Sequence, residues 1–258
     1  MPTIIHPTAI VEPGAYLDEN VTVGAYAYIG KEVQIASGTR IDHHASIVGK
    51  TKIGKHNHFF PFVSIGQVTQ DLKYQEEPTF LEIGDYNTFR EFCTVNRGTA
   101  PHARTLIGNH NLFLAYVHIA HDCQLGDHII MSNNGTLAGH VIVEDYVVIG
   151  GLSAVHQFCR IGSHSMIGGC TKIVQDVPPY FIADGNPADV RAVNTVGLQR
   201  RGFADETIRV IRDAYKILYD RTLNTTQALE KISATLPSTK EIQHLVNFVR
   251  NSRRGIIR

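Results

Sequence analysis

Two histidines, His118 and His121, are the side chains of this sequence best suited to chemistry. They lie in the stretch YVHIAHDCQLG, residues 116–126. A neutral imidazole can accept a proton from a hydroxyl group, and its unperturbed pKa of about 6.5 suits this work at neutral pH. We therefore expect general-base catalysis here if the fold presents the imidazole at the surface.

The sequence around these histidines repeats every six residues. From Ile5 to Ile173, every sixth residue is Ile, Leu, Val, Met or Phe, except at Asp71, Glu77 and Pro101. An amphipathic helix repeats near 3.6 residues and a strand at 2, so neither explains this period. A period of six is typical of hexapeptide β-solenoids. We predict a mainly β protein built on a parallel β-helix, with three six-residue repeats per coil.

Two segments interrupt the repeat, and the chain after it differs in character. Residues 71–82 and 101–106 are polar or carry proline, so we expect them to loop out of the column without changing its phase. The repeat stops at Pro178, and helical spacing begins. We predict a β-helix over residues 1–190, with a protruding loop near 71–82, and a helical domain over 191–258. Asp205 is expected to cap one helix, and Ser238 with Glu241 to form the capping box of another.

The composition is that of a globular protein, with 43% hydrophobic and 19% charged residues. No secretory signal is visible, and no apolar run approaches the roughly 20 residues needed to span a bilayer, so we expect a soluble cytoplasmic protein. Four cysteines in 258 residues do not suggest a disulfide scaffold. Cys93, Cys123 and Cys159 fall on small inward positions and are expected to fill the core.

The repeat predicts which side chains meet on the surface, because residues 18 apart should stack. His121, Gly139 and Gln157 form one stack, and Asp122, His140 and Phe158 form the next. A glycine leaves its backbone N–H accessible to an oxyanion, and the imidazole can take a proton. This pairing suits acyl transfer.

Two further stacks have functional and structural interpretations. Gly151 and Gly169 stack with Ala115 and Asn133 and would leave a shallow groove for a long thin ligand, although glycine at a tight turn is the alternative. A second stack contains His110, His128, Tyr146 and His164. Residues in one stack point in one direction and do not converge tetrahedrally, which favours a solvated ladder over a metal site.

Several long motifs occur in the order typical of one family. The chain resembles the bacterial UDP-N-acetylglucosamine O-acyltransferases of lipid A synthesis in the motifs IGQVTQDLKY (65–74), HIAHDC (118–123), TLAGHV (136–141), HQFCRIG (156–162), GGCTKIVQDVPPY (168–180) and GLQRRGF (197–203). The resemblance covers almost the whole chain. It implies a left-handed solenoid that acts in the first step of lipid A biosynthesis, moving an (R)-3-hydroxyacyl group from acyl carrier protein to the glucosamine 3-hydroxyl of UDP-N-acetylglucosamine.

The resemblance also implies residue roles. His121 would be the general base, the Gly139 N–H would stabilise the oxyanion, and Asp122 would orient the imidazole. The sugar nucleotide would be bound by Gln70, Asp71, Lys73, His118, His140, His156 and Gln157. Asn194, Arg200 and Arg201 would meet the nucleotide or the carrier's phosphopantetheine. Gly169, with Gly151, would set the acyl length. No metal or other cofactor is implied.

Members of the family are homotrimers with active sites between subunits, so the resemblance implies the same assembly here. The basic segment 192–258 has twelve Lys/Arg against six Asp/Glu. Its Arg209, Arg212 and Lys216 would attract the acidic carrier protein, unless they only form a solvated helix face. Two positions depart from the family pattern, Asn96 (commonly His) and Val196 (often Glu). They leave open a 3-amino sugar nucleotide as the acceptor.

Three other functions are the alternatives to this assignment. The related N-acyltransferase of the same pathway carries an extra N-terminal uridine-binding domain, for which a repeat starting at Ile5 leaves no room. A γ-class carbonic anhydrase uses a His-x4-His zinc pair, and no two histidines here are five apart. A trimeric scaffold that only binds the carrier protein would lose nothing measurable on replacement of His121.

Overall fold

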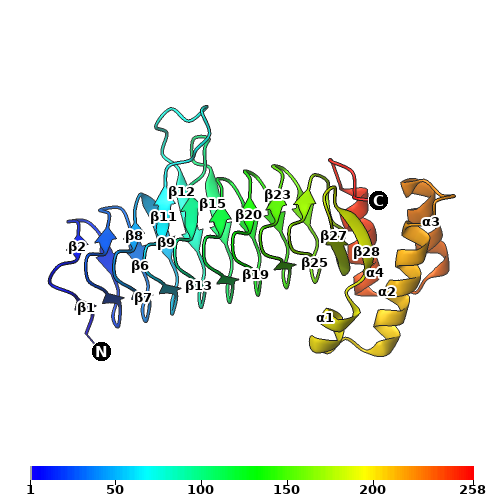
Figure 1. Ribbon diagram of the computed structural model, residues 1–258, viewed down its shortest axis with the longest axis horizontal. Coiled ribbons are helices and arrows are strands. Elements are labelled where there is room, and N and C mark those ends of the chain that lie inside the picture. Colours follow the sequence, from blue (N-terminus) through cyan, green and yellow to red (C-terminus); the bar gives the residue numbers. More distant parts are fainter. Residues whose placement is uncertain (1) are drawn as a thin grey trace.

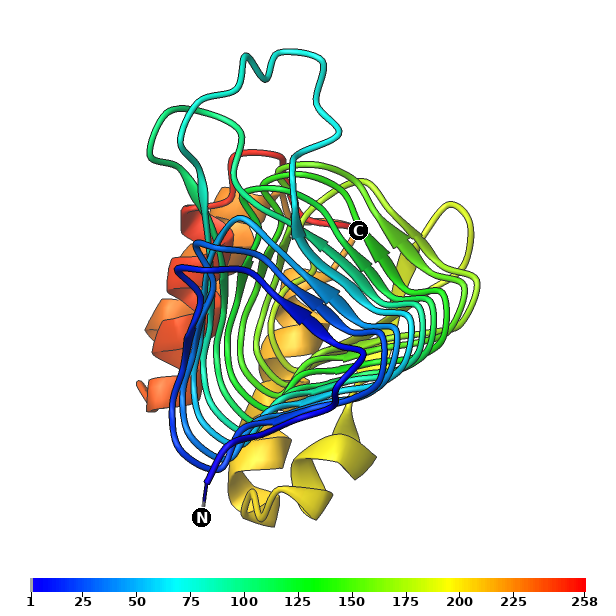
Figure 2. The ribbon, with the colours of Figure 1, turned by 90° about the vertical axis from the view of Figure 1, so that its left-hand side faces the viewer.

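The six-residue repeat folds into a column of stacked coils with a helical unit at its C-terminal end (Figure 1). The computed structural model describes residues 2–258. Each coil contributes one strand to each of three sheets, and strands one coil apart pair in parallel, as His118 does with Thr136. Seen from the N-terminal end, the chain turns counter-clockwise as it recedes, so the β-helix is left-handed (Figure 2). The predicted fold class is therefore confirmed.

The three sheets contain eleven, nine and eight strands. The eleven-stranded sheet consists of β1 (Ile4–Ile5), β4 (Thr22–Val23), β7 (Arg40–Ile41), β10 (His58–Phe59), β13 (Thr88–Phe89), β16 (Leu112–Phe113), β19 (Ile130–Met131), β22 (Val148–Ile149), β25 (Met166–Ile167), β27 (Phe181–Asp184) and β28 (Asp189–Val193). The nine-stranded sheet consists of β2 (Ile10–Val11), β5 (Tyr28–Ile29), β8 (Ser46–Ile47), β11 (Ser64–Gln67), β14 (Thr94–Asn96), β17 (His118–Ile119), β20 (Thr136–Leu137), β23 (Ala154–Val155) and β26 (Lys172–Ile173). The eight-stranded sheet consists of β3 (Tyr16–Leu17), β6 (Gln34–Ile35), β9 (Lys50–Ile53), β12 (Phe80–Ile83), β15 (Arg104–Ile107), β18 (Gln124–Leu125), β21 (Ile142–Val143) and β24 (Arg160–Ile161).

The core of the column is made of the residues that recur every sixth position. Phe59, Phe89 and Phe113 are fully buried and stack at centroid distances of 4.9 Å. Such aromatic pairs contribute about 0.5–1.5 kcal/mol each beyond the burial of their surface. Ile5 remains 46% exposed because the first coil has no coil beneath it.

The predicted core cysteines are also buried. Burial raises the pKa of Cys123 to about 12, so this thiol is un-ionised and unreactive near neutral pH. Cys93 and Cys159 are equally inaccessible, which confirms their structural role.

The three corners of the column place outward side chains at regular intervals. The third residue after each core position often has a positive φ, as in Asp122 (60°), His140 (60°) and Phe158 (66°). Non-glycine residues adopt this conformation in only a few per cent of cases. Here the positive φ turns the chain sharply at the corner. The side chain at this position points outward, and the equivalent side chain of the next coil lies directly above it.

Two loops leave the column, but both are shorter than predicted. The expected breaks at 71–82 and 101–106 each lose their last three residues, because β12 and β15 extend to four residues and pair in register. Leu81 and Thr105 are buried in this ladder, which explains the extension. Phe59 pairs with Phe89 and Phe89 with Phe113, so these partners are 30 and 24 residues apart in the sequence instead of the usual 18. Each loop therefore adds a multiple of six residues, and the six-residue repeat keeps its phase across both loops.

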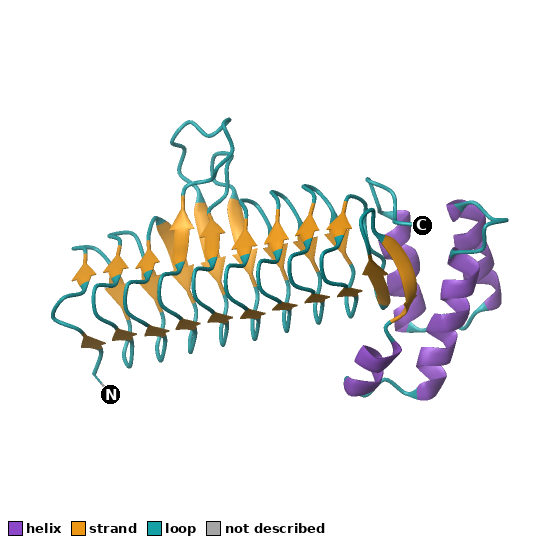
Figure 3. Cartoon of the chain, viewed as in Figure 1, coloured by secondary structure: helices purple, strands orange, loops and turns teal. Residues whose placement is uncertain are grey.

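The helical unit comprises α1 (Thr195–Arg200), α2 (Asp205–Leu218), α3 (Thr225–Thr235) and α4 (Lys240–Arg250), which gather beyond the last strands (Figure 3). A second apolar core, including Phe181, Leu198 and Ile211, joins these helices to β27 and β28. The boundary predicted at residue 190 falls inside β28, which pairs antiparallel with β27. No helix among residues 2–258 has the length and apolar character to cross a membrane.

Two predicted helix caps were wrong. Ala204 occupies the N-cap of α2, so Asp205 lies in its first turn, where a carboxylate still favours the helix dipole. Thr239, not Ser238, caps α4 by accepting a hydrogen bond from the Ile242 N–H. The predicted capping box with Glu241 does not form, since the chain enters the helix one residue later than expected.

Candidate active site

His121 lies at the corner where the chain turns from the nine-stranded to the eight-stranded sheet, between β17 and β18. Its imidazole rests on Gly139, one coil further on. A Cβ atom added to Gly139 would lie 2.4 Å from Cε1 and 2.5 Å from Nε2 of His121. The two coils are joined by the hydrogen bond from the His140 N–H to the His121 carbonyl, at 3.0 Å. The predicted stacking of His121 on Gly139 is therefore confirmed.

Gly139 keeps its amide free of backbone partners. Among residues 2–258, the Gly139 N–H donates to no carbonyl group, although the Gly139 carbonyl accepts from Phe158 at 3.1 Å. The absence of a side chain at Gly139 allows the ring of His121 to lie against the backbone. An imidazole and an available amide thus share one position on the surface.

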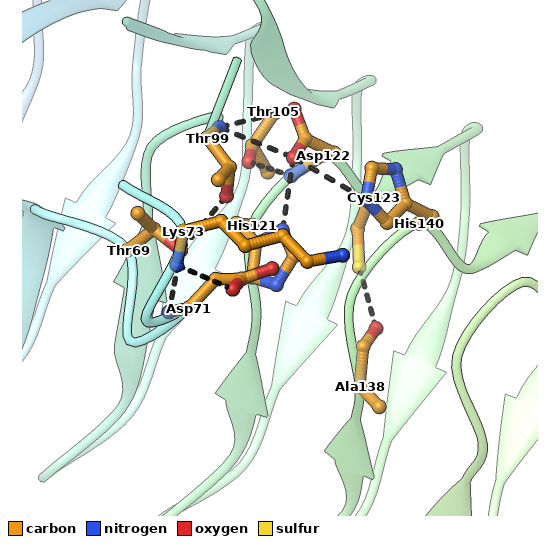
Figure 4. A network of polar contacts seen from close by, with 10 residues as sticks. All are labelled: Thr69, Asp71, Lys73, Thr99, Thr105, His121, Asp122, Cys123, Ala138 and His140. Carbon is orange, nitrogen blue, oxygen red and sulfur yellow. Dashed lines mark hydrogen bonds and ion pairs between the residues drawn. The ribbon is translucent and has the colours of Figure 1, made fainter. Parts of the chain in front are cut away.

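Asp122 orients the His121 ring. Its Oδ2 lies 2.9 Å from Nδ1 of His121, and its carboxylate also accepts a hydrogen bond from the Thr99 N–H at 3.1 Å. The Asp122 N–H donates to Thr105 Oγ1 at 2.9 Å. The side chain of Asp122 is only 9% exposed, so these contacts hold it in place (Figure 4). With Nδ1 directed at the carboxylate, Nε2 is the ring nitrogen left for a substrate.

The first loop is tied to this corner through two threonines. Thr99 Oγ1 donates to Thr69 Oγ1 at 2.9 Å, and Thr69 Oγ1 accepts from the Asp71 N–H at 3.0 Å. Asp71 in turn accepts from the Lys73 N–H at 2.9 Å. In the view of Figure 4, Asp71 and Lys73 lie in front of His121. The charges of both loop residues act on His140. The six-residue repeat does not predict the contact between Thr69 and Thr99, because each of them lies just before a segment that leaves the column.

His140 occupies the same corner one coil above. Its ring stacks on Phe158 at 4.6 Å and meets His121 edge-on at 5.1 Å. Its Nε2 lies 3.7 Å from Asp122 Oδ2. Burial lowers the pKa of His140, while the charges of Asp122 and Asp71 oppose that shift.

His118 lies beside this corner on the outer surface of β17. Its Nδ1 is 2.7 Å from Thr94 Oγ1, and burial lowers its pKa, so the ring stays neutral near pH 7. His156 and Gln157 lie one coil beyond His140 and are exposed, with His156 Nδ1 3.1 Å from the Gln157 carbonyl. Gln70 is exposed on the loop. The sugar-nucleotide residues predicted by resemblance thus gather along one edge of the column.

Asn96, one of the two departures from the family pattern, lies at the base of the first loop. It is 5% exposed, and its Nδ2 donates to the Val68 carbonyl at 2.9 Å. Its Oδ1 is buried and has no hydrogen-bond partner among the described residues. Asn96 therefore supports the loop from below. Val196, the other departure, is 58% exposed on α1.

The predicted acyl-length residues lie on a different corner. Gly151 and Gly169 stack where the chain turns from the eleven-stranded to the nine-stranded sheet. A Cβ on Gly169 would meet only the Gly151 carbonyl, at 3.5 Å, so the space above it is open. The predicted stacking of the glycines is confirmed, but one chain does not place them at the His121 corner.

The third corner lies where the chain turns from the eight-stranded to the eleven-stranded sheet, and it carries a ladder of stacked aromatic rings. The predicted residues Asn194, Arg200 and Arg201 belong to the chain beyond this ladder. The rings of Tyr86, His110, His128, Tyr146 and His164 stack at 4.7–5.0 Å with nearly parallel planes. Arg201 covers this ladder, with Cζ 4.7 Å from the centre of the Tyr146 ring. Burial, and then the charge of Arg201, lowers the pKa of His164 to about 4, which keeps that ring neutral.

Asn194 is largely occupied by structural contacts. Its side chain accepts from the Gly197 N–H to cap α1 and donates to the His164 carbonyl at 2.9 Å. Of the basic residues on α2, Arg209 pairs with Glu206 and Lys216 with Asp213. Arg212 donates instead to Thr195 Oγ1 and has no carboxylate partner within residues 2–258. Arg200 is exposed at the end of α1.

Comparisons with known proteins agree with this architecture. The family model described as "Udp N-acetylglucosamine O-acyltransferase; Domain 2" matches residues 176–257. The chain is 49% identical to the acyl-[acyl-carrier-protein]--UDP-N-acetylglucosamine O-acyltransferase of Herminiimonas arsenicoxydans, over 99% of this chain and 100% of that protein. It is 48% identical to the enzyme of the same name from Thiobacillus denitrificans, over 98% and 99% of the two chains.

Solved structures give the same assignment. The structure of LpxA from Acinetobacter baumannii superposes with a TM-score of 0.95 at 45% identity, covering 99% of this chain and 100% of that one. LpxA from Bacteroides fragilis, described as a UDP-N-acetylglucosamine acyltransferase, superposes with a TM-score of 0.97 at 43% identity over the same shares. Sequence and structure agree over the full length of these relatives, and the chain therefore belongs to the UDP-N-acetylglucosamine O-acyltransferase family.

Proposed function

We propose that this enzyme moves an (R)-3-hydroxyacyl group from acyl carrier protein to the 3-hydroxyl of the glucosamine in UDP-N-acetylglucosamine. The names of its relatives support the two substrates. The observation that carries the proposal is the His121 imidazole, held by Asp122 and resting on the free amide of Gly139. This reaction is the first step of lipid A biosynthesis, and we expect it to take place in the cytoplasm.

The chemistry follows from the orientation of His121. Its Nε2 accepts the proton of the sugar hydroxyl as the oxygen attacks the thioester carbonyl. The resulting oxyanion is stabilised by the Gly139 N–H. When the intermediate collapses, the C–S bond breaks and the imidazolium returns the proton to the departing phosphopantetheine thiol. Asp122, at 2.9 Å from Nδ1, fixes the tautomer and stabilises the transient positive charge.

The sugar nucleotide would lie along the His121 corner. Lys73 brings a positive charge suited to a diphosphate, and Asp71 brings hydrogen-bond acceptors for sugar hydroxyls. His118 and His140 are neutral near pH 7 and can donate or accept hydrogen bonds there. The threonine contacts described above, which tie the loop to the His121 corner, support this arrangement.

The distribution of the predicted residues over three corners supports a homotrimer. A convex column cannot enclose a substrate, whereas a cleft between two columns can. The corner that carries Gly151 and Gly169 also carries a ridge of exposed aromatic side chains, Tyr26, Phe62, Phe92 and Tyr116, which are 42–62% exposed. Exposed apolar surface of this kind marks an interface. Threefold packing would set this corner of one subunit against a different corner of the next.

The proposed function is tested with purified protein, a series of hydroxyacyl carrier proteins, and either UDP-N-acetylglucosamine or its 3-amino analogue. Mass spectrometry of the products is expected to show one hydroxyacyl group added to UDP-N-acetylglucosamine, with the carrier returned as a free thiol. A product only with the amino analogue would contradict the choice of the 3-hydroxyl as acceptor. Analytical ultracentrifugation of the same sample is expected to give the mass of three chains.

Gly169→Met should shift the preferred acyl group to a shorter chain. A methionine side chain at this position projects into the open space above the Gly151 carbonyl and would shorten the groove. The preference of the unmodified enzyme is expected to be for a longer chain, of about the hydroxymyristoyl class. The measurement is the relative rate across the carrier series.

Ala25→Met is the control for this change, because Ala25 occupies the equivalent position on the same corner several coils earlier. It should leave the chain-length profile unaltered. Coinciding profiles for Gly169→Met and the unmodified enzyme would show that the groove lies elsewhere.

A further inference from the structure

The cluster of His121, Asp122 and His140 has a second use. We propose that it binds a transition-metal ion such as Zn²⁺ and that the bound ion inhibits the enzyme. One ring nitrogen of each histidine and one carboxylate oxygen of Asp122 lie within 4.8 Å of one another. Within residues 2–258, no other three His, Cys, Asp or Glu side chains are so placed.

The distances within the cluster fit a tetrahedral ion. Zinc binds imidazole nitrogen and carboxylate oxygen at about 2.0–2.2 Å, which sets neighbouring donor atoms about 3.4 Å apart. Asp122 Oδ2 is 2.9 Å from His121 Nδ1 and 3.7 Å from His140 Nε2. These separations lie on either side of the required value. The His140 side chain is 39% exposed and free to adjust. Two imidazoles with one carboxylate are ligands that favour zinc, cobalt or nickel over magnesium or calcium.

The surroundings leave one coordination position open and do not oppose a cation. The charges of Asp71 and Lys73 act on His140 in opposite directions. His121 and Asp122 are 12% and 9% exposed, so the open position lies on the side of His140. Three protein ligands with a free fourth position resemble zinc sites that accept water or a small ligand.

Metal binding would remove the proposed base. An imidazole bound to metal through Nδ1 carries its proton on Nε2, and that nitrogen then has no lone pair for the sugar hydroxyl. The ion would also take the Asp122 oxygen that orients the ring. This inhibition rests on the proposed function of His121. The binding of the ion does not.

The binding is tested by titrating the full-length protein with Co²⁺ and following the visible absorption of the tetrahedral ion, then displacing it with Zn²⁺. One ion per chain is expected. His140→Ala removes a ligand and should weaken binding about 100-fold or more, since even partners outside the ligand set cost 10–100-fold. Asp122→Asn, a second variant, should weaken it as well. His128→Ala, which alters the aromatic ladder, should leave the affinity unchanged.

The inhibition is tested by assaying acyl transfer at the Zn²⁺ concentration that saturates the site, and again after removal of the ion with a chelator. Loss of activity that the chelator reverses is the expected result. Absence of the Co²⁺ spectrum, or equal affinity in His140→Ala, Asp122→Asn and the unmodified protein, would overturn the metal site and leave the acyltransferase proposal standing. Saturation without inhibition would overturn the inhibitory role and also contradict His121 as the base.

Discussion

Replacement of His121 by alanine is expected to slow acyl transfer about 10²–10⁴-fold, which is the usual contribution of a positioned general base. The loss should appear in kcat, because the imidazole acts on the proton that moves in the transition state. The measurement is the initial rate of product formation with hydroxyacyl carrier protein and UDP-N-acetylglucosamine. The fold should be preserved, because the His121 side chain packs against Gly139 on the outside of the column and is not part of the hydrophobic core.

Two comparisons make this result specific. His128→Ala removes another outward histidine, from the aromatic ladder on a different corner, and should keep full activity. Free imidazole added to His121→Ala should restore part of the rate, because the variant leaves a ring-sized space between Asp122 and Gly139. Rates within about threefold of the unmodified enzyme would instead favour a scaffold that binds the carrier protein without reacting.

The regular part of the structure follows from the sequence because each six-residue repeat makes the same contacts as its neighbours. A core residue at every sixth position and three sheets per coil fix which side chains stack, so the contact of His121 with Gly139 was predictable. The register also predicted the stacking of Gly151 and Gly169. Where the six-residue repeat is interrupted, it does not predict at which residue the chain rejoins the column. The loop ends were therefore misplaced by three residues at Phe80 and Arg104.

The contacts made by the irregular segments could not be predicted from the sequence. Thr99 and Thr69 connect Asp122 to the first loop, but they meet only because two loops leave adjacent coils. The helix caps depend on a single backbone turn, which is why Asp205 and Ser238 were each misassigned. The family resemblance named His121, Gly139 and Asp122 together. The structure adds the distances that relate them.

Gly139→Ala is expected to lower the rate about 100-fold without unfolding the protein, since a displacement of about 1 Å at a reacting group can cost this much. The three atoms nearest to the added Cβ all belong to the His121 ring, at 2.4, 2.5 and 3.1 Å. Because these atoms are the end of a side chain and not backbone, the ring can swing aside while the coil stays intact. The imidazole then leaves the position from which Nε2 reaches the sugar hydroxyl.

The same substitution in the His121→Ala background separates this cause from a general defect. If Gly139→Ala acts only by displacing the imidazole, the double variant should be no slower than His121→Ala alone, because the ring is already absent. Thermal unfolding of all three variants checks that the column is intact. A further loss of tenfold or more in the double variant would mean that the methyl group disturbs the Gly139 amide as well. Full activity of Gly139→Ala would mean that the imidazole does not need to rest on this glycine, and the proposed geometry of catalysis would be wrong.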